Sequence, residues 1–297
     1  MSYFELENDS DFNRWTENKK RLYDFEYLDQ LHQGVEINSP DMKGSAAWKT
    51  MFDQISRFNF SIYRLALEIP FKKEQINQLG LSFGLIQTDA NLCADEDSLS
   101  KISVTEQKDA KKYIPYTNKK LGWHTDGYYN PYHQRVQAFI LHCQQSAASG
   151  GSNCLLDPDI AYIHLRQHNP DFIQALSRAD VMCIPENVQN NAVLRPKTCS
   201  AVFSIEQDTH ALNMRYSERK FNIIWHQDPL TQDALSCLNE FLDSDSPYII
   251  KRRLNAGEGI ICNNVLHKRS SFTDDLEQPR IFYRARYYNR IQQLGLR

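Results

Sequence analysis

The sequence predicts a mixed α/β fold with a mainly β core, an antiparallel barrel decorated by helices, built as a single domain over residues 1–297. Two observations carry this prediction. Residues 135–143 alternate and are rich in Val, Phe and Ile, as in a half-buried strand, and the chain ends on two more strand-like segments, 259–266 and 280–288. Helical segments fall between these strands, the pattern expected of a barrel with inserted helices.

The first 120 residues predict two helices and one strand. Residues 40–60 have the pattern of a capped helix, and a short strand follows at 60–67. The segment KKEQINQLGLSFG indicates a second helix that ends at Gly80 or Gly84. The polar stretch from residue 89 to residue 120 predicts a long loop with little regular structure.

Three helix starts of one kind appear in the second half of the chain. Each has a capping residue followed by proline at the first helical position: Asp157-Pro158, Asn169-Pro170 and Asp228-Pro229. After the third start, five apolar residues at helical spacing predict a stripe that packs in the core. They are Ala234, Leu235, Leu238, Phe241 and Leu242.

Composition narrows the class of protein and its partners. The net charge of −3 gives no electrostatic case for nucleic acid or an anionic membrane, and no apolar run is long enough to span a bilayer. The N-terminal residues lack the pattern of a signal peptide. The seven cysteines are odd in number and lack CxxC spacing, which predicts reduced thiols in a cytoplasmic protein. We expect a small-molecule substrate as the partner; a homo-oligomer stays open.

One short segment predicts a metal site. In Gly122–Tyr128, GWHTDGY, His124 and Asp126 point to the same side of an extended strand because side chains alternate. Two histidines and one carboxylate form the facial triad of non-haem iron(II) oxygenases, but an HxD pair alone also occurs by chance. His267 lies far enough along the chain to supply the second histidine. Arg280 follows at a spacing that suits a returning hairpin, and a buried carboxylate beside the metal favours arginine as its partner.

Three segments together resemble the taurine dioxygenase (TauD/TfdA-like) family of Fe(II)- and 2-oxoglutarate-dependent oxygenases. They read WHTDGYY at 123–129, GGSN at 150–153, and GEGIICNNVLHKR followed by RIFYRAR near the end. The resemblance implies a double-stranded β-helix (jelly-roll) barrel that binds Fe(II), 2-oxoglutarate and O2. It also implies hydroxylation or oxidative cleavage of a small metabolite, with release of succinate and CO2. Asp126 disfavours a related halogenase, which has a small residue there.

The same resemblance assigns roles to individual residues. It makes His124, Asp126 and His267 the iron ligands and Arg280 the partner of the distal carboxylate of 2-oxoglutarate. Asn153 stands where a hydroxyl residue is commoner, and its amide could serve the same carboxylate. Arg284 falls where a second arginine lies near the iron-bound end of the cosubstrate and the substrate.

The substrate is predicted to be anionic. Arg280, Arg284 and Arg286 have the same parity in the sequence and would share one face of a strand. An unpaired arginine is costly to bury, so a carboxylate, sulfonate or phosphonate would be its partner. Alternatively, Arg286 pairs with a protein carboxylate, such as Asp274, Asp275 or Glu277. Tyr128 and Tyr129 are the other substrate candidates; they either line the pocket, form a cage for a quaternary ammonium group, or merely pack.

Two other classes of function stay open at this point. The triad could hold zinc in a hydrolase, although that gives no reason for Arg280 or GGSN. The barrel could also be catalytically silent and bind a small molecule as a sensor. The remaining seven histidines lack a matching context, and His226 is the stand-in should His267 fail as a ligand.

Overall fold

A computed structural model describes residues 2–66, 72–89, 99–104, 114–189, 192–275 and 277–292. The chain divides into two compact units, each made of three segments. The first unit comprises Met1–Asp24, Gly122–Arg135 and Leu156–Ile249, and the second comprises Phe25–Leu121, Val136–Leu155 and Ile250–Arg297. Within the described ranges, none of the helices has the length and apolarity that crossing a membrane requires. Helices and strands are both abundant, which confirms the mixed α/β class.

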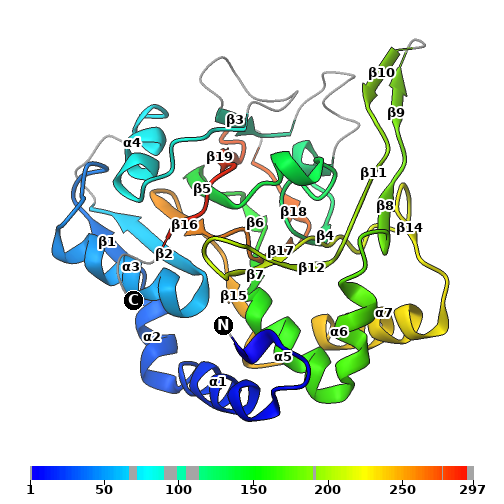
Figure 1. The fold of residues 1–297 in the computed structure, drawn as a ribbon. Helices are drawn as coiled ribbons and strands as arrows, with labels where there is room; N and C mark the ends of the chain where they lie inside the picture. The colour runs from blue at the N-terminus through cyan, green and yellow to red at the C-terminus, as the bar shows by residue number, and fades with distance from the viewer. Residues whose placement is uncertain are drawn as a thin grey trace. The chain divides into compact units, whose positions relative to one another are not determined.

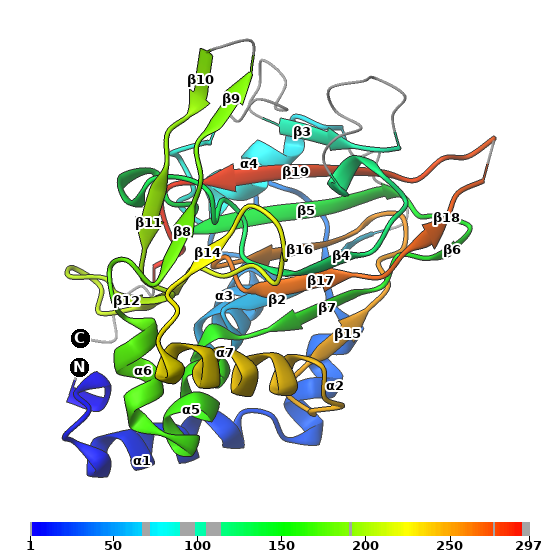
Figure 2. The ribbon, with the colours of Figure 1, turned by 90° about the vertical axis from the view of Figure 1, so that its right-hand side faces the viewer.

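A six-stranded sheet forms the core of the second unit, and Figure 2 shows several of its strands side by side. Its order is β1-β2-β16-β5-β19-β3. The strands are β1 (Val35–Ile37), β2 (Phe60–Leu65), β16 (Glu258–Cys262), β5 (Ala138–Gln145), β19 (Ile281–Tyr287) and β3 (Leu99–Ile102). The pairs β16–β2, β16–β5, β19–β5 and β19–β3 are antiparallel, whereas β1 and β2 are parallel. Strand β3 lies in the stretch predicted to be a loop, so that prediction is wrong for residues 99–102.

Strand β5 has two different faces, and both are covered. Ala138 and Ile140 belong to a buried cluster together with Met51 and Leu79 from helices. Phe139 faces the other way, and its ring lies 4.8 Å from the ring of His267. The predicted half-buried strand is therefore buried on both faces, and one face packs against helices while the other meets a candidate ligand.

Two helices cover the first of these faces (Figure 1). Helix α3 (Ala46–Phe58) begins where Ser45 Oγ accepts the backbone N–H of Trp48 at 3.0 Å, and it ends at Asn59, whose φ is 62°. Helix α4 (Gln75–Ser82) passes through Gly80, where a side-chain carbon would stand 2.5 Å from the hydroxyl of Tyr287. Both predicted helices and the strand after the first are confirmed. A third helix of this unit, α2 (Phe25–Gln33), was not predicted.

The last part of the chain contains more strands than the sequence predicts. In place of one strand at 259–266 there are two, β16 and β17 (Leu266–Arg269). Asn264 lies between them with φ 46°, a left-handed conformation that ends the first strand. Strand β17 neighbours β7 (Asn153–Leu156), which pairs with β15 (Ile250–Arg252), and β18 (Phe272–Thr273) pairs with β6 (Ser149–Gly150).

Helices of the first unit begin where the sequence predicts. Helix α5 (Pro158–His168), α6 (Pro170–Leu176) and α7 (Pro229–Leu242) each have proline in the first turn and an Asp or Asn cap. The caps Asp157, Asn169 and Asp228 accept backbone N–H groups at 3.0, 3.0 and 2.9 Å. The predicted stripe on α7 is buried. Helix α1 (Asp9–Arg21) and the short turns η1 (Ser2–Phe4) and η4 (Tyr132–Gln134) complete the helical part.

Short strands of the first unit went unpredicted. They form three small sheets with the orders β11-β8-β14, β10-β9 and β12-β13. Their bounds are β8 (Met182–Ile184), β9 (Asn187–Gln189), β10 (Ala192–Arg195), β11 (Thr198–Ser200), β12 (Phe203–Ile205), β13 (Leu212–Met214) and β14 (Ile224–Trp225). Strands of two to four residues are too short for an alternation pattern to be recognised in the sequence.

The prediction that all cysteines are reduced is wrong for two of them. Cys183 and Cys199 form a disulfide across the antiparallel pair β8–β11, where they stand directly opposite each other with Cα atoms 4.0 Å apart. Cys93 lies outside the described residues. Cys143, Cys154 and Cys237 are free thiols.

Candidate metal and cosubstrate site

The segment that carries His124 and Asp126 is fixed from several sides within the first unit. Strand β4 (Leu121–His124) ends on His124, which forms a bridge with Ser217. Thr125 donates its N–H to the carbonyl of Tyr216 at 3.0 Å. The fully buried Trp123 donates its indole N–H to Leu242 at 2.9 Å. The strand direction of this segment is thereby held on both sides of His124.

His124 and Asp126 approach each other as the alternation predicts. His124 Nε2 lies 3.7 Å from Asp126 Oδ1, and the two residues are 7% and 4% exposed. His124 Nδ1 lies 2.8 Å from the carbonyl oxygen of Gly122. Because a carbonyl can only accept, the Nδ1 position carries the proton and Nε2 has a lone pair directed to the Asp126 side.

His267 has the same local arrangement in the second unit. Its Nδ1 lies 2.9 Å from the carbonyl oxygen of Val265, again two residues earlier, so its Nε2 also keeps a lone pair. The ring packs on Phe139. Such a bond from the second ring nitrogen to a carbonyl is the usual support of a metal-binding histidine.

The pair Asn263-Asn264 positions the His267 strand. Asn263 accepts the N–H of Ile291 at 3.0 Å, which holds the chain end. Asn264 adopts the left-handed turn and donates to the carbonyl of Val136 at 2.7 Å. This pair therefore fixes the start of β17 at Leu266, and His267 is the second residue of that strand.

His124 and Asp126 thus offer two metal-type ligand atoms in the first unit, and His267 offers a third from the second unit. His226, the stand-in, has both nitrogens occupied. Its Nδ1 lies 2.5 Å from Asp228 Oδ2, and its Nε2 lies 2.8 Å from Arg178 Nη2. A metal would have to break one of these bonds, so His226 is disfavoured as a ligand.

The Gly-Gly pair brings the backbone close to Arg280. A side-chain carbon at Gly150 would stand 2.4 Å from the Ser271 carbonyl oxygen, and one at Gly151 would stand 3.8 Å from Arg280 Nε. Both glycines have positive φ, 73° and 71°. Two residues later Asn153, 5% exposed, begins β7. The GGSN segment and Arg280 thus belong to one region of the second unit.

This region contains buried donors that lack a hydrogen-bond partner among the described residues. They are Asn153 Nδ2 and Arg280 Nη1. Arg280 is 3% exposed and lies between aromatic rings, 3.7 Å from the centroid of Phe282 and 4.9 Å from that of Phe272. A buried cation with an unused donor is costly unless an anion meets it. The region therefore fits a carboxylate ligand.

Electrostatics at Arg280 agree with this fit. Burial, together with the neighbouring charge of Arg269, lowers the pKa of Arg280 to about 9. Asp274 lies nearby and raises that pKa, but its Oδ1 accepts the backbone N–H of Arg280 at 2.7 Å. Arg280 is still charged at pH 7, and the Asp274 contact uses the backbone and not the guanidinium.

Arg284 and Arg286 lie on β19 and share a face by alternation, whereas Arg280 precedes that strand. The register shift opposite Ile281 and Phe282 puts its extra residue, Gln144, on the partner strand β5. Arg286 Nη2 lies 2.5 Å from Asp89 Oδ2, and the two are 2% and 5% exposed at their side chains. The alternative of a protein carboxylate is therefore the correct one for Arg286, although the partner is Asp89. Arg284 is half-buried opposite Leu141 and Ser100.

Tyr128 is surrounded by positive charge within the first unit. Its carbonyl accepts the Nε–H of Arg215, and its hydroxyl lies 3.3 Å from Arg219 Nη1. The ring of Tyr129 packs edge-on at 5.3 Å. A cage for a quaternary ammonium group would be electrostatically unfavourable between these arginines.

Arg215 is a residue that sequence reasoning missed, since the segment NMRYSER carries no recognisable motif. Its Nη1 donates to Met182 at 3.0 Å and to Ser200 Oγ at 2.7 Å, whereas its buried Nη2 has no hydrogen-bond partner among the described residues. Burial and the charge of Arg195 lower the pKa of Arg215 to about 10, so it is cationic at pH 7. Like Arg280, it has an unused donor for an anion.

Comparisons with known proteins place this geometry in context. Residues 51–286 match the family model described as "Taurine catabolism dioxygenase TauD, TfdA family". A uridine-5'-phosphate dioxygenase from Streptomyces is 28% identical over 207 residues, which cover 67% of this chain and 72% of that protein.

Solved structures show a similar fold. A taurine dioxygenase from Burkholderia xenovorans is 17% identical with a TM-score of 0.57, covering 86% of this chain and 88% of that one. An asparagine oxygenase, solved with Fe(II), 3-hydroxyasparagine and succinate, is 13% identical with a TM-score of 0.57, covering 91% and 89%.

Proposed function

The chain belongs to the TauD, TfdA family and is an Fe(II)- and 2-oxoglutarate-dependent dioxygenase, and from this premise we propose that His124, Asp126 and His267 hold its iron. The observation that carries the proposal is the matching support of the two histidines. Each uses Nδ1–H to bind the carbonyl two residues earlier and keeps Nε2 for a metal. Asp126 supplies the anionic oxygen beside His124.

We further propose that Asn153 and Arg280 bind the distal carboxylate of 2-oxoglutarate. Their unused, buried donors support this, because an amide and a guanidinium both hydrogen-bond to carboxylate oxygens. Arg284 is proposed to act near the iron-bound end of the cosubstrate. The neighbouring Phe272 and Phe282 rings exclude water from the Arg280 contact, which strengthens it.

These contacts indicate which roles belong to the residues of this chain and which to the bound iron and cosubstrate. When bound, iron with 2-oxoglutarate and O2 supplies the oxidising chemistry, with succinate and CO2 as products. The residues of this chain bind, orient and exclude water. His124 and His267 enter as neutral rings with fixed orientation, and Arg280 orients the cosubstrate through its distal end.

For the substrate, we propose a small anionic metabolite, and within that class a nucleoside 5'-phosphate. The charge around Tyr128 supports an anion, since Arg215 has an unused donor and Arg219 stands at the tyrosine hydroxyl. The name of the Streptomyces relative supports the phosphate. Arg286, once a candidate for this role, is replaced by Arg215 because its guanidinium already meets Asp89.

We also propose a jelly-roll core, a single domain over residues 1–297 and a cytoplasmic location. The antiparallel sheets of the second unit and the similar solved structures support the jelly-roll core. The free thiols support the cytoplasm, whereas the Cys183–Cys199 disulfide weighs against it because cytosolic proteins rarely keep disulfides.

An anaerobic iron titration tests the metal and cosubstrate assignments. With wild-type protein, Fe(II) plus 2-oxoglutarate should give a visible charge-transfer band, which a zinc hydrolase or a silent binding protein would lack. The variants His124→Ala, Asp126→Ala and His267→Ala should each lose the band and turnover while remaining folded. His226→Ala is the matched control and should keep both. Full activity of the His267→Ala variant would disprove the assignment.

A matched panel tests the substrate class. Nucleoside 5'-monophosphates and the corresponding nucleosides would be compared for stimulation of succinate formation. We expect stimulation by the phosphates alone, and we expect Arg215→Met to raise the KM for the phosphate substrate without changing that for 2-oxoglutarate. Equal stimulation by both sets, or a preference for the uncharged nucleosides, would disprove an anionic substrate.

A further inference from the structure

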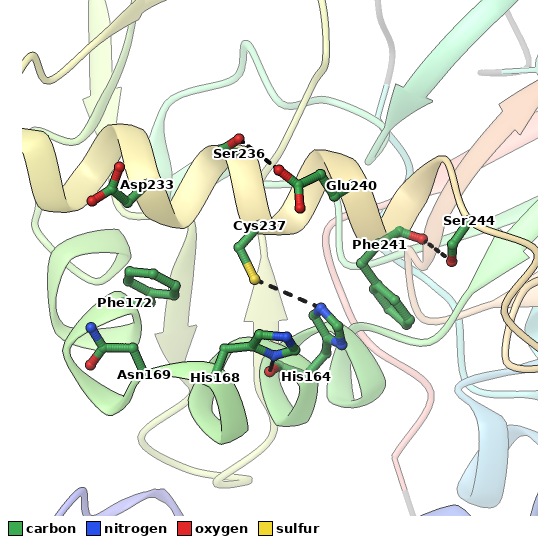
Figure 3. A pocket seen from close by; sticks show the side chains of 10 residues that line it. All are labelled: His164, His168, Asn169, Phe172, Asp233, Ser236, Cys237, Glu240, Phe241 and Ser244. Atoms are coloured by element: carbon green, nitrogen blue, oxygen red, sulfur yellow. Dashed lines mark hydrogen bonds between the residues drawn. The ribbon is translucent and has the colours of Figure 1, made fainter.

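A second cluster of metal-type ligands lies within the first unit, between α5 and α7 (Figure 3). His164 and His168 stand one turn apart on α5, and Cys237 faces them from α7. One donor atom from each residue lies within 4.8 Å of the other two. Together they line a pocket of about 680 Å³. None of the three was singled out by the sequence motifs.

The distances fit a tetrahedral ion. Cys237 Sγ lies 3.7 Å from His164 Nε2. A zinc ion at about 2.3 Å from sulfur and about 2.0–2.1 Å from nitrogen would hold those two atoms about 3.6 Å apart at the tetrahedral angle. The observed 3.7 Å is longer than a strong hydrogen bond and close to the distance expected between a sulfur and a nitrogen ligand of one zinc ion.

Each ring presents a nitrogen to the ion. His168 Nδ1 lies 2.9 Å from the carbonyl oxygen of His164, so Nδ1 carries the proton and Nε2 keeps its lone pair. The ring of His164 stacks on Phe241 at 4.0 Å, which fixes its orientation towards Cys237. Burial, helped by the charges of His168 and Lys20, lowers the pKa of His164 to about 4, so this ring is neutral at pH 7.

We propose that His164, His168 and Cys237 form a second metal site, which binds Zn²⁺ or a similar borderline divalent cation and joins α5 to α7. Two imidazoles and a thiolate suit zinc, and binding releases the Cys237 proton because the thiolate is the ligand. Three protein ligands leave a fourth position, which the open side of the pocket supplies with water. The half-buried setting of His164 and Cys237 and the exposed setting of His168 leave the site accessible from solvent.

This site differs chemically from the proposed iron site, and that difference provides the test. A cobalt(II) ion bound by a thiolate gives an intense near-ultraviolet charge-transfer band, whereas two histidines and one carboxylate give none. We would titrate the full-length protein with Co²⁺ anaerobically, without added thiol, and follow this band. One equivalent of thiolate-bound Co²⁺ is expected, and Zn²⁺ should displace it.

Variants assign the band to the cluster. Cys237→Ser should abolish it, and His168→Gln should weaken Co²⁺ binding at least tenfold. Cys154→Ser, which changes another free thiol, and Asp126→Ala, which changes the proposed iron site, should both retain it. In the Asp126→Ala background, where the proposed iron site is disabled, Zn²⁺ should raise the Tm, and adding Cys237→Ser should remove that rise. Dioxygenase activity in the single Cys237→Ser variant should stay unchanged. A missing band, or one that persists in Cys237→Ser, would overturn the proposal.

Discussion

Arg280 and Arg286 lie close together in the sequence, both are buried, and their surroundings differ in one respect. Arg286 faces the carboxylate of Asp89, which Tyr288 also contacts through its hydroxyl at 2.6 Å. Arg280 faces two aromatic rings and keeps an unused donor at Nη1. A buried charge is costly unless an opposite charge meets it. Asp89 meets the charge of Arg286, whereas Arg280 requires an anionic ligand. The difference separates an arginine that serves stability from one that serves binding.

The largest expected effect follows from removing the binding arginine. Arg280→Ala should raise the KM for 2-oxoglutarate by roughly 10²- to 4 × 10³-fold, because a buried carboxylate left unpaired costs ~3–5 kcal/mol. Arg280→Lys keeps the positive charge but cannot form two parallel hydrogen bonds to the carboxylate. Its KM for 2-oxoglutarate should therefore lie between those of Arg280→Ala and the wild type. Steady-state kinetics with varied 2-oxoglutarate would measure this. A KM that stays unchanged in Arg280→Ala would contradict the anchor assignment.

Removing Arg286 should lower the stability of the protein and leave cosubstrate binding unchanged. Arg286→Ala leaves Asp89 buried without its cation, and we expect the free energy of unfolding to fall by ~3–5 kcal/mol. The KM for 2-oxoglutarate should not change in the protein that remains folded. Urea unfolding gives the first quantity. Adding Asp89→Asn to the Arg286→Ala background should recover part of the lost stability. If it does not, the unpaired Asp89 carboxylate is not the cause of the lower free energy of unfolding.

Asn153 tests the same binding region with a smaller effect. Asn153→Ala removes one hydrogen bond to a charged group, worth ~1–3 kcal/mol, so the KM for 2-oxoglutarate should rise roughly 5- to 150-fold. Asn153→Thr is the matched control, because a hydroxyl can donate to the same carboxylate. An Asn153→Thr variant as impaired as Asn153→Ala would indicate that the amide acts on something else.

The sequence predicted those parts of the molecule that are specified locally. The caps Asp157, Asn169 and Asp228 act on the backbone within three residues, so their helices could be placed directly. The same holds for His124 and Asp126, because strand alternation brings them together without any distant contact.

Features that depend on distant segments could not be predicted. The partner of Arg286 comes from a separate part of the chain, and nothing near Asp89 indicates it. Cys183 and Cys199 are paired by the register of two short strands, which an odd cysteine count conceals. The left-handed Asn264 divides the last predicted strand into two, and that depends on backbone conformation. Arg215 was missed because its role rests on burial.

The smallest expected effect is a pH dependence of the KM for 2-oxoglutarate, which follows from the ionisation of Arg280. Burial and the charge of Arg269 lower the pKa of Arg280 to about 9 in the protein without ligand. Below that pH the guanidinium is charged and can meet a carboxylate, and as pH rises through the pKa the charged fraction falls to one half. The KM for 2-oxoglutarate should therefore be flat near pH 7 and rise as the pH passes through about 9. Kinetics over this range would measure the rise, with the KM of the second substrate as the control. A KM for 2-oxoglutarate that stays flat beyond pH 9 would show that loss of charge at Arg280 does not govern cosubstrate binding.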